Sequence, residues 1–164
     1  MYLGIDPGLA TMGYGLVQGE GDRLQCLEYG VLTTSSQEKM PERLLSLFER
    51  TDELIREYQP FSLAMEQLFF SKNVKTAFQV GQARGVIILA AARHGLDVFE
   101  YSPLEIKKGI TGYGQADKKQ MQSLVRSILN LEELPQPDDA ADALAVAICH
   151  LQVHRLRQKM EEWL

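Results

Sequence analysis

Residues 2–18, with the sequence YLGIDPGLATMGYGLVQ, decide how the chain can begin to fold. The segment 2–6 is a short apolar run that ends at Asp6 and meets a Pro-Gly turn pair, which predicts a buried strand. Residues 13–18 and 24–34 also have strand character, and the turn-rich GEGDR between them predicts a hairpin. The chain is therefore expected to open with three strands in succession.

Helices and strands are expected to alternate after this hairpin. In order, the pattern predicts a helix over 41–58, a strand over 61–66, a helix over 73–94, a strand over 97–101, helices over 103–110 and 117–130, and a last helix from Asp138. Hairpin-linked strands that lead into strand–helix–strand units predict an α/β fold. We expect a five-stranded mixed sheet, three antiparallel strands followed by parallel ones, with helices on both faces. Residues 1–164 are expected to form a single domain, in which 151–164 is a C-terminal helical extension that carries Trp163.

The composition is that of an ordinary globular protein, with 45% hydrophobic and 24% charged residues in a chain of 164. No apolar run reaches 18 residues, and the N-terminus lacks a basic region followed by an apolar stretch. Neither a membrane span nor a signal peptide is therefore expected. The two cysteines, Cys26 and Cys149, lie far apart and without metal-ligand spacing. They are expected to be reduced thiols in a cytoplasmic protein.

Positive charge is concentrated in one part of the chain, although the net charge is −5. Between Phe69 and Arg126 there are nine basic and four acidic residues, so this segment carries +5 and the remainder −10. Such an asymmetry is typical of a face that binds nucleic acid. Basic but merely solvated helix surfaces would give the same counts, so charge alone leaves both interpretations open.

Acidic side chains end two of the expected strands and start the last helix. Asp6 closes the first strand and Glu66 the fourth, and the carboxyl ends of parallel strands border the working crevice of an open α/β sheet. Asp139 and Asp142 are three residues apart and share one face of the last helix. These four acids are therefore expected to come together.

Each acid has an ordinary explanation when it is taken alone: a turn residue at Asp6, a strand-end charge at Glu66, and a helix N-cap at Asp138. Four carboxylates in one partly buried place would repel one another and lose hydration, which is unfavourable unless a cation neutralises them. Mg²⁺ is the usual cation at such oxygen ligands where phosphates complete the shell. Two such ions, roughly 4 Å apart, can clamp the attacking water and the leaving oxygen of a phosphodiester.

Five sequence blocks carry a resemblance to a known family. They are GIDPGLATMGYG, MEQLFFSKN, GQARG, IKKGITGYGQADKKQM and DDAADALAVAICH. In this order they resemble the signature blocks of the RuvC family of bacterial Holliday-junction resolvases, over residues 2 to about 150. The resemblance implies an RNase H-like fold and a homodimer that binds a four-way DNA junction in recombination and DNA repair. It also implies symmetric, Mg²⁺-dependent nicking of two strands of like polarity, with the RuvA–RuvB branch-migration complex as a partner.

The resemblance also implies the roles of individual residues in catalysis. The family's four metal-binding acids fall on Asp6, Glu66, Asp139 and Asp142, which are expected to hold two Mg²⁺ ions, with Mn²⁺ able to substitute. Lys118 is expected to assist catalysis by stabilising phosphate charge or orienting the water. Asp138 is an additional acid to which the resemblance assigns no role, and we expect it to cap the helix.

The same blocks imply a set of DNA contacts. Phe69 falls on the aromatic position that stacks against a base near the crossover, and Lys107 and Lys118 fall on positions that contact the backbone. A core phenylalanine and an ordinary surface turn would explain FFSKN and TGYGQADKK equally well. The residues expected to bind DNA are Phe69, Lys72, Asn73, Lys107, Tyr113, Lys118 and Lys119.

Other interpretations remain open at this point. GIDPG also resembles the first phosphate loop of actin-like ATPases and sugar kinases, although these need a second domain and a second phosphate loop. A related ribonuclease and a catalytically dead junction-binding module are further alternatives. Gly81 and Gly85 predict close approach of another backbone, either the chain's own sheet or a partner helix. Because His94, His150 and His154 have no partnered serine or cysteine motif, structural or surface roles are expected for them.

Overall fold

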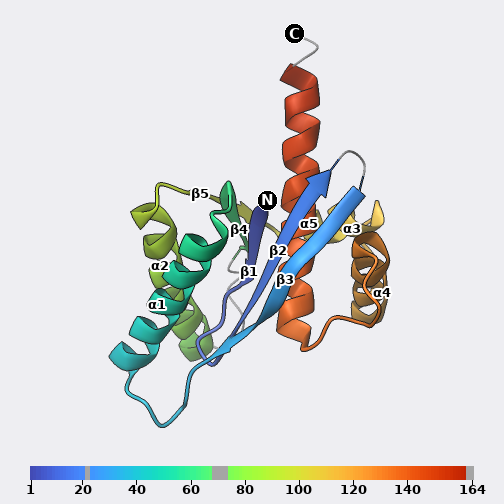
Figure 1. Ribbon diagram of the computed structural model, residues 1–164. Helices are drawn as coiled ribbons and strands as arrows, with labels where there is room; N and C mark the ends of the chain where they lie inside the picture. Colours follow the sequence, from blue (N-terminus) through green and yellow to red (C-terminus); the bar gives the residue numbers. More distant parts are fainter. Residues whose placement is uncertain (21–22, 68–73, 162–164) are drawn as a thin grey trace.

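The computed structural model describes residues 1–20, 23–67 and 74–161 (Figure 1). Its elements are β1 (Tyr2–Asp6), β2 (Thr11–Glu20), β3 (Arg23–Thr33), α1 (Met40–Tyr58), β4 (Ser62–Glu66), α2 (Val74–Arg93), β5 (Asp97–Tyr101), α3 (Pro103–Thr111), α4 (Lys118–Leu129) and α5 (Asp138–Glu161). Each helix and strand expected from the sequence is present, in the expected order. Phe69, Lys72, Asn73 and Trp163 lie outside the described residues.

The five strands form one mixed sheet in the order β3–β2–β1–β4–β5. β2 pairs antiparallel with both β1 and β3, whereas β4 pairs parallel with both β1 and β5. The five-stranded mixed sheet expected from the sequence is therefore confirmed. Since Ile5 of β1 lies opposite Met65 of β4, Asp6 and Glu66 end neighbouring strands at the same end of the sheet.

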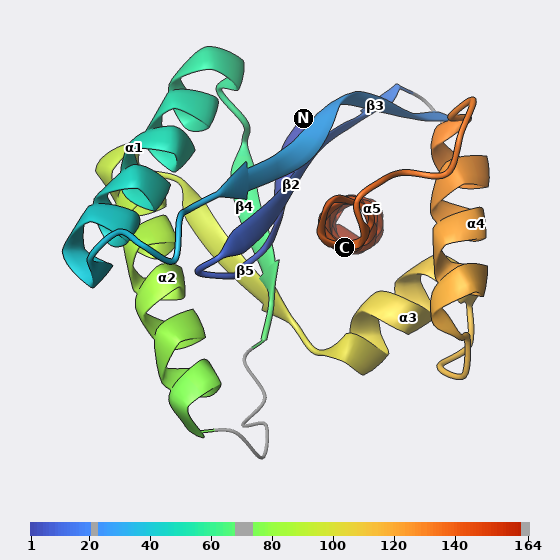
Figure 2. The same cartoon turned by 90° about the horizontal axis from the view of Figure 1, so that it is seen from below.

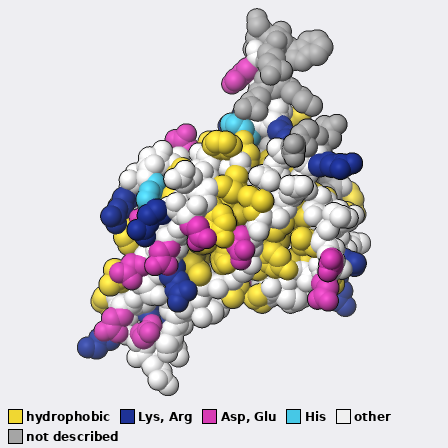
Figure 3. Space-filling model, in the orientation of Figure 1, with side chains coloured by type: hydrophobic (Ala, Val, Ile, Leu, Met, Phe, Trp, Pro, Cys, Tyr) yellow, Lys and Arg dark blue, Asp and Glu magenta, His cyan; other side chains and the backbone are white. Residues whose placement is uncertain are grey.

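Helices cover both faces of the sheet, as expected (Figure 2). α1 and α2 pack against each other on one face, and α5 crosses the other face over β1 and β2, with α3 and α4 beyond it. In β1, Leu3 and Ile5 join the core that includes residues of α1 and α2, while Gly4 between them lies against α5. Figure 3 shows charged side chains of both signs over α1 and a central group of apolar side chains over the sheet.

The sequence of α5 reflects its position between the sheet, α3 and α4 (Figure 2). Every residue from 143 to 151 is buried, so apolar side chains occupy all sides of this part of the helix rather than one stripe. The helix continues to Glu161, in keeping with the expected helical extension. Even so, no helix among the described residues is long and apolar enough to span a bilayer.

Two glycines let α5 lie very close to the sheet. A Cβ atom at Gly13 would be 1.9 Å from the carbonyl oxygen of Asp139, and one at Gly4 would be 2.2 Å from the carbonyl oxygen of Ala143. Both separations are far too short for nonbonded atoms, so only glycine fits at these strand positions. Because Gly13 is also the sheet partner of Asp6, this contact places the first turn of α5 next to the end of β1.

His150 connects α5 to the parallel strands by hydrogen bonds. The ring is 1% exposed, with Nε2 2.7 Å from Ser62 Oγ in β4 and Nδ1 2.7 Å from the Tyr101 hydroxyl in β5. Burial, with smaller contributions from His154 and Arg157, lowers the pKa of His150 to about 4, so the ring is neutral at pH 7. This arrangement agrees with the structural role expected for the histidine.

Candidate active site

The structure brings the four expected acids to one end of the sheet. Asp6 ends β1, and Glu66 ends the neighbouring strand β4. Asp139 and Asp142 lie in the first two turns of α5, whose start is held against β2 by the contact at Gly13. The approach of two strand ends and one helix start therefore gathers carboxylates that are distant in the sequence.

These carboxylates act on one another electrostatically. Burial, reinforced by neighbouring negative charges, raises the pKa of Asp6 to about 7. The charges responsible are those of Asp142, Asp139 and Glu66, and the ammonium group of Lys118 opposes them. Burial followed by the charge of Asp142 raises the pKa of Glu66, and burial also raises the pKa of Asp142. Full ionisation of the cluster is therefore unfavourable without a compensating cation.

The chemistry of the four side chains suits a hard divalent cation. Carboxylate oxygens are the ligands that Mg²⁺ and Mn²⁺ prefer, and a bound cation would offset the burial and the repulsion that together raise the pKa of Asp6. In the side-chain conformations of this structure, no three His, Cys, Asp or Glu residues in the described part of the chain are close enough to share one ion. Binding an ion would therefore involve rotation of these side chains toward a common point.

A pocket of about 260 Å³ opens beside the acids. Glu66 and Asp142 contribute carboxylates to its wall, and Lys107 and Lys118 contribute ammonium groups. The remaining lining is largely apolar: Pro103, Ile106, Ala116, Met121 and Ala145, with Asp117. Two lysines next to the carboxylates could attract a phosphodiester to a place where the acids alone would repel it.

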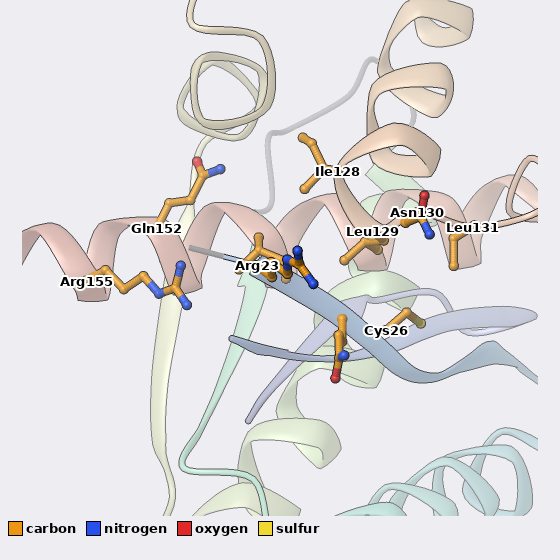
Figure 4. Close-up of a pocket in the computed structure, with 10 residues that line it drawn as sticks. Arg23, Cys26, Ile128, Leu129, Asn130, Leu131, Gln152 and Arg155 are labelled. Carbon is orange, nitrogen blue, oxygen red and sulfur yellow. The ribbon is translucent and has the colours of Figure 1, made fainter. Parts of the chain in front are cut away.

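A larger hollow, of about 870 Å³, lies between β3, the end of α4, and α5 (Figure 4). Its lining includes Arg23, Cys26 and Arg155. The described residues that line it include none of the four acids, so size alone does not identify the candidate active site.

Lys118 connects the two helices that flank the acids. Its Nζ atom in α4 lies 2.9 Å from Oδ2 of Asp138 and 3.7 Å from Oδ2 of Asp142, both in α5. Gln122, one turn further along α4, donates from Nε2 to the other oxygen of Asp138 at 2.8 Å. Hydrogen bonds from Lys118 and Gln122 lower the pKa of Asp138, and the bond to Asp138 raises the pKa of Lys118. The lysine is therefore held as a cation next to the acids.

The structure corrects the capping role expected for Asp138. The amides of Ala140 and Ala141 donate to the backbone carbonyl of Pro137, at 3.0 and 3.3 Å, and Asp138 is already the first residue of α5. Because a backbone oxygen accepts these hydrogen bonds, the Asp138 carboxylate is free to pair with α4.

The residues expected to bind DNA are only partly described. Lys107 and Lys118 lie at the pocket beside the acids. Tyr113, just after α3, is 54% exposed, and Lys119 is exposed in the first turn of α4. The other three expected contacts, Phe69, Lys72 and Asn73, precede α2 and lie outside the described residues.

Arg84 is a buried residue near the site that the sequence reasoning did not single out. Its side chain in α2 donates from Nη1 to the backbone carbonyl of Glu66 at 2.5 Å and forms an ion pair with Glu100 of β5. It therefore fixes α2 to the strand ends next to one of the acids. In the sequence Arg84 is one of nine positive charges, and its place in the GQARG block is the signal that could have distinguished it.

The fold, with acids at the ends of β1 and β4 and at the start of the last helix, is that of an RNase H-like nuclease domain. A solved structure of the same fold, T. thermophilus RuvC in complex with Holliday junction substrate, matches with a TM-score of 0.88. It is 34% identical in sequence, and the match covers 94% of this chain and 95% of that one.

Sequence comparison gives the same result at higher identity. The crossover junction endodeoxyribonuclease RuvC of Rubrobacter xylanophilus is 57% identical over 154 residues, which cover 94% of this chain and 86% of that protein. Its counterpart in Natranaerobius thermophilus is 51% identical over 158 residues, or 96% and 98% of the two chains. The family model of crossover junction endodeoxyribonuclease RuvC matches residues 2–150. This chain belongs to the RuvC family, and the ATPase and sugar-kinase interpretation of GIDPG is therefore set aside.

Proposed function

We propose that this chain resolves Holliday junctions by metal-dependent phosphodiester hydrolysis in recombination and DNA repair. Its relatives carry the name of crossover junction endodeoxyribonuclease, and one of them was solved with a Holliday junction substrate. The observation that carries the proposal for this chain is the meeting of four carboxylates at one partly buried place, where burial and, after it, the charges of the other three acids raise the pKa of Asp6 to about 7. Such a cluster is unfavourable in a purely structural role and well suited to cation binding.

Asp6, Glu66, Asp139 and Asp142 are the residues that would hold two divalent ions, with Mg²⁺ as the natural ion and Mn²⁺ as a substitute. Bound there, the ions would activate water and stabilise the leaving oxygen. Asp6 is the central ligand in this proposal, because all three other acids influence its pKa. Lys118 adds positive charge beside the cluster, where it can stabilise charge that develops on the phosphate.

The residues around the pocket would hold the DNA strand. Lys107 and Lys118 can bind backbone phosphates next to the acids, and exposed Tyr113 and Lys119 can extend this contact along α4. The family resemblance supplies the proposed contacts of Phe69, Lys72 and Asn73.

Symmetric cleavage would need two active sites, and α2 offers a surface for a second copy of the chain. Val74, Phe78 and Leu89 are 80%, 68% and 58% exposed, and their spacing places them on one side of the helix. Gly85 lies on the same side, with nothing within 4 Å of a Cβ atom built at that position. We therefore favour a partner helix, rather than the chain's own sheet, as the reason for glycine there. A homodimer through this face would present two carboxylate clusters to one junction.

Two further parts of the proposal follow from the substrate and the family. Because the proposed substrate is chromosomal DNA, we propose that this chain acts in the bacterial cytoplasm. The RuvA–RuvB branch-migration complex is its proposed functional partner through the family resemblance.

The decisive experiment incubates the whole chain with a synthetic mobile four-way DNA junction, with and without Mg²⁺. We expect paired symmetric nicks in two strands of like polarity, and only with the metal. Asp6→Asn should abolish nicking but retain junction binding in a gel-shift assay, because phosphate contacts supply most of the affinity. Mg²⁺-dependent nicking by Asp6→Asn would contradict the proposed site. Cleavage of an RNA–DNA hybrid in preference to the junction would support a related ribonuclease instead.

A further inference from the structure

Asp138 is the acid at the start of α5 that the family resemblance leaves without a role. Its side chain bridges α5 and α4, with Oδ2 2.9 Å from Lys118 Nζ and Oδ1 2.8 Å from Gln122 Nε2. Lys118 in turn lies 3.7 Å from Asp142, one of the four clustered acids. Asp138 therefore pairs with a lysine that also lies beside one of the clustered acids.

This ion pair differs from an isolated surface pair, although both partners are about half exposed, at 55% for Lys118 and 54% for Asp138. Gln122 is only 9% exposed, so the partner that fixes the second oxygen of Asp138 is itself fixed by packing. A carboxylate held at one oxygen by a buried amide has fewer orientations in which to meet the lysine. The entropy lost on pairing is correspondingly smaller than for two free surface side chains.

The stability of α4 does not explain why a lysine occupies its first position. Lys118 is the first residue of α4, directly after the N-cap Asp117. Positive charge is unfavourable at a helix N-terminus because the helix dipole places partial positive charge there. A contact outside the helix is therefore the better reason for a lysine at this position, and the contacts present are Asp138 and Asp142.

We propose that Asp138 is a positioning residue that holds the Lys118 ammonium beside Asp142, at the edge of the pocket where the DNA strand would bind. The inference rests on the proposed function, because it concerns the catalytic lysine of that reaction. An ammonium group has three hydrogen-bond donors. The contact with Asp138 uses one and leaves others for Asp142 and for a phosphate oxygen. Without Asp138, the flexible four-carbon stem of Lys118 can move its charge into solvent.

The opposite role is a lock, in which Asp138 withdraws Lys118 from the phosphate and slows cleavage. The two roles predict opposite effects of removing the Asp138 charge. Asp138→Asn keeps the size of the side chain and an oxygen for Gln122, so it tests the charge with little change in packing. Glu132→Gln is the matched control, because it removes one exposed negative charge from the segment between α4 and α5.

The first measurement uses the whole chain without metal or DNA. Reductive methylation of lysines, followed by mass spectrometry, reports how freely each amine reacts, and Lys119 serves as the exposed internal reference. Asp138→Asn should raise the labelling rate of Lys118 by about five-fold, the upper end of the range for an exposed ion pair. The rate at Lys119 should not change, and Glu132→Gln should leave both rates as in the wild type. Equal labelling of Lys118 in wild type and Asp138→Asn would show that Asp138 does not hold Lys118 in solution.

The second measurement is single-turnover cleavage of the four-way junction with saturating protein and Mg²⁺. We expect Asp138→Asn to cleave about five-fold more slowly, as the strength of an exposed ion pair allows. Because the protein is saturating, a change in junction affinity does not affect this rate. Asp138→Glu, which keeps the carboxylate, should recover most of the rate. In a Lys118→Gln background, Asp138→Asn should have no further effect, because a residue that acts through Lys118 has nothing left to position.

The outcomes separate this inference from the proposed function. A wild-type chain that does not nick the junction with Mg²⁺ contradicts the proposed function, whatever the labelling shows. If the wild type nicks the junction, an increased rate for Asp138→Asn identifies a lock and overturns the positioning role. An additional loss of rate on adding Asp138→Asn to Lys118→Gln overturns it as well, since the effect then does not pass through the lysine.

Discussion

Asp6 must lose a proton before it can act as a metal ligand, and its surroundings oppose that loss. Burial and the charges of the neighbouring acids raise its pKa to about 7, so a large fraction of the metal-free protein carries a protonated Asp6 near neutral pH. Cation binding and deprotonation of Asp6 are therefore coupled. The residue proposed to be most important for catalysis is also one that reduces the stability of the fold.

The first prediction concerns this loss of stability. The pKa of Asp6 is raised from 3.8 to about 7 on folding, so between these pH values the folded state keeps a proton that the unfolded state has lost. This group therefore lowers stability as pH rises through the window, and its full penalty applies above pH 7. In EDTA, Asp6→Asn should be more stable than the wild type by about 2 kcal/mol at pH 8, but not at pH 3.5. Urea unfolding at the two pH values measures this difference, and an equal effect at both would contradict it.

At the residue scale, the sequence predicts the acids but not their partners. Asp6 and Glu66 follow from strand ends, and Asp139 and Asp142 follow from helical spacing, because both patterns are local. The pairing of Asp138 with Gln122 depends instead on how α4 packs against α5, which no local pattern reports. The cap prediction for Asp138 was wrong for the same reason, since Pro137 supplies the acceptor and Lys118 and Gln122 of α4 contact the Asp138 carboxylate.

The contact between α5 and the antiparallel strands decides where two of the four acids lie. The separation of only 1.9 Å between a Cβ atom at Gly13 and the Asp139 carbonyl means that a methyl group there would push the start of α5 outward. Asp139 and Asp142 would move with it. The stability of the sheet–helix packing and the geometry of the acids thus depend on the same glycine.

We expect Gly13→Ala to lose about 3 kcal/mol of folding free energy, at the upper end of the usual cost of overpacking, because the added methyl group meets backbone rather than a movable side chain. Cleavage should fall even under conditions where the variant is folded. Gly30→Ala on β3 is the matched control, since the atoms nearest to its Cβ would belong to the side chain of Tyr14, with the hydroxyl oxygen at 2.9 Å. Urea unfolding and junction cleavage of both variants test this, and equal losses would contradict the special role of Gly13.

At the scale of elements, local periodicity is sufficient for most of the fold. The helix expected over 73–94 is Val74–Arg93, and the strand expected over 97–101 is Asp97–Tyr101. The strand expected over 13–18 is longer, Thr11–Glu20, because Gly19 and Glu20 continue the ladder by pairing with Leu24 and Arg23. Their composition indicates a turn, but pairing with the next strand extends β2 through them.

For the whole molecule, the charge count over 69–126 overstates the basic surface. Arg84 is 7% exposed and pairs with Glu100, and Arg93 is paired with Asp52 of α1. The charge of Glu100 is already counted in the sum, so its pair with Arg84 leaves the excess unchanged but keeps this positive charge in the interior, whereas Asp52 lies outside 69–126 and offsets the charge of Arg93. Lys107 and Lys118 lie beside the acids, so the location of the positive charge is more informative for the proposed DNA contact than its sum.

The exposed side of α2 leads to a prediction for the assembled protein. Phe78 is 68% exposed in the single chain, and burial of several such side chains would stabilise a dimer. Phe78→Glu should therefore convert the proposed dimer to a monomer in sedimentation-velocity experiments and leave the chain folded by circular dichroism. Phe61→Glu is the control, because Phe61 is 74% exposed but lies before β4 rather than on α2. A wild type that sediments as a monomer at every concentration used would exclude the dimer.

His150 contributes to the rotational setting of α5, together with the close contacts at Gly4 and Gly13. This helix segment is apolar on every side, so its orientation depends on close contacts, such as that of Ala147 with Gly4, and on hydrogen bonds. The hydrogen bonds to Ser62 and Tyr101 are directional, and turning the helix by one residue, about 100°, would break both of them. The same turn would carry Asp142, about 12 Å away along the axis, off the side that faces Asp6. The hydrogen bonds of His150 therefore help to fix the rotation of α5, so that a polar contact remote from the acids contributes to their alignment.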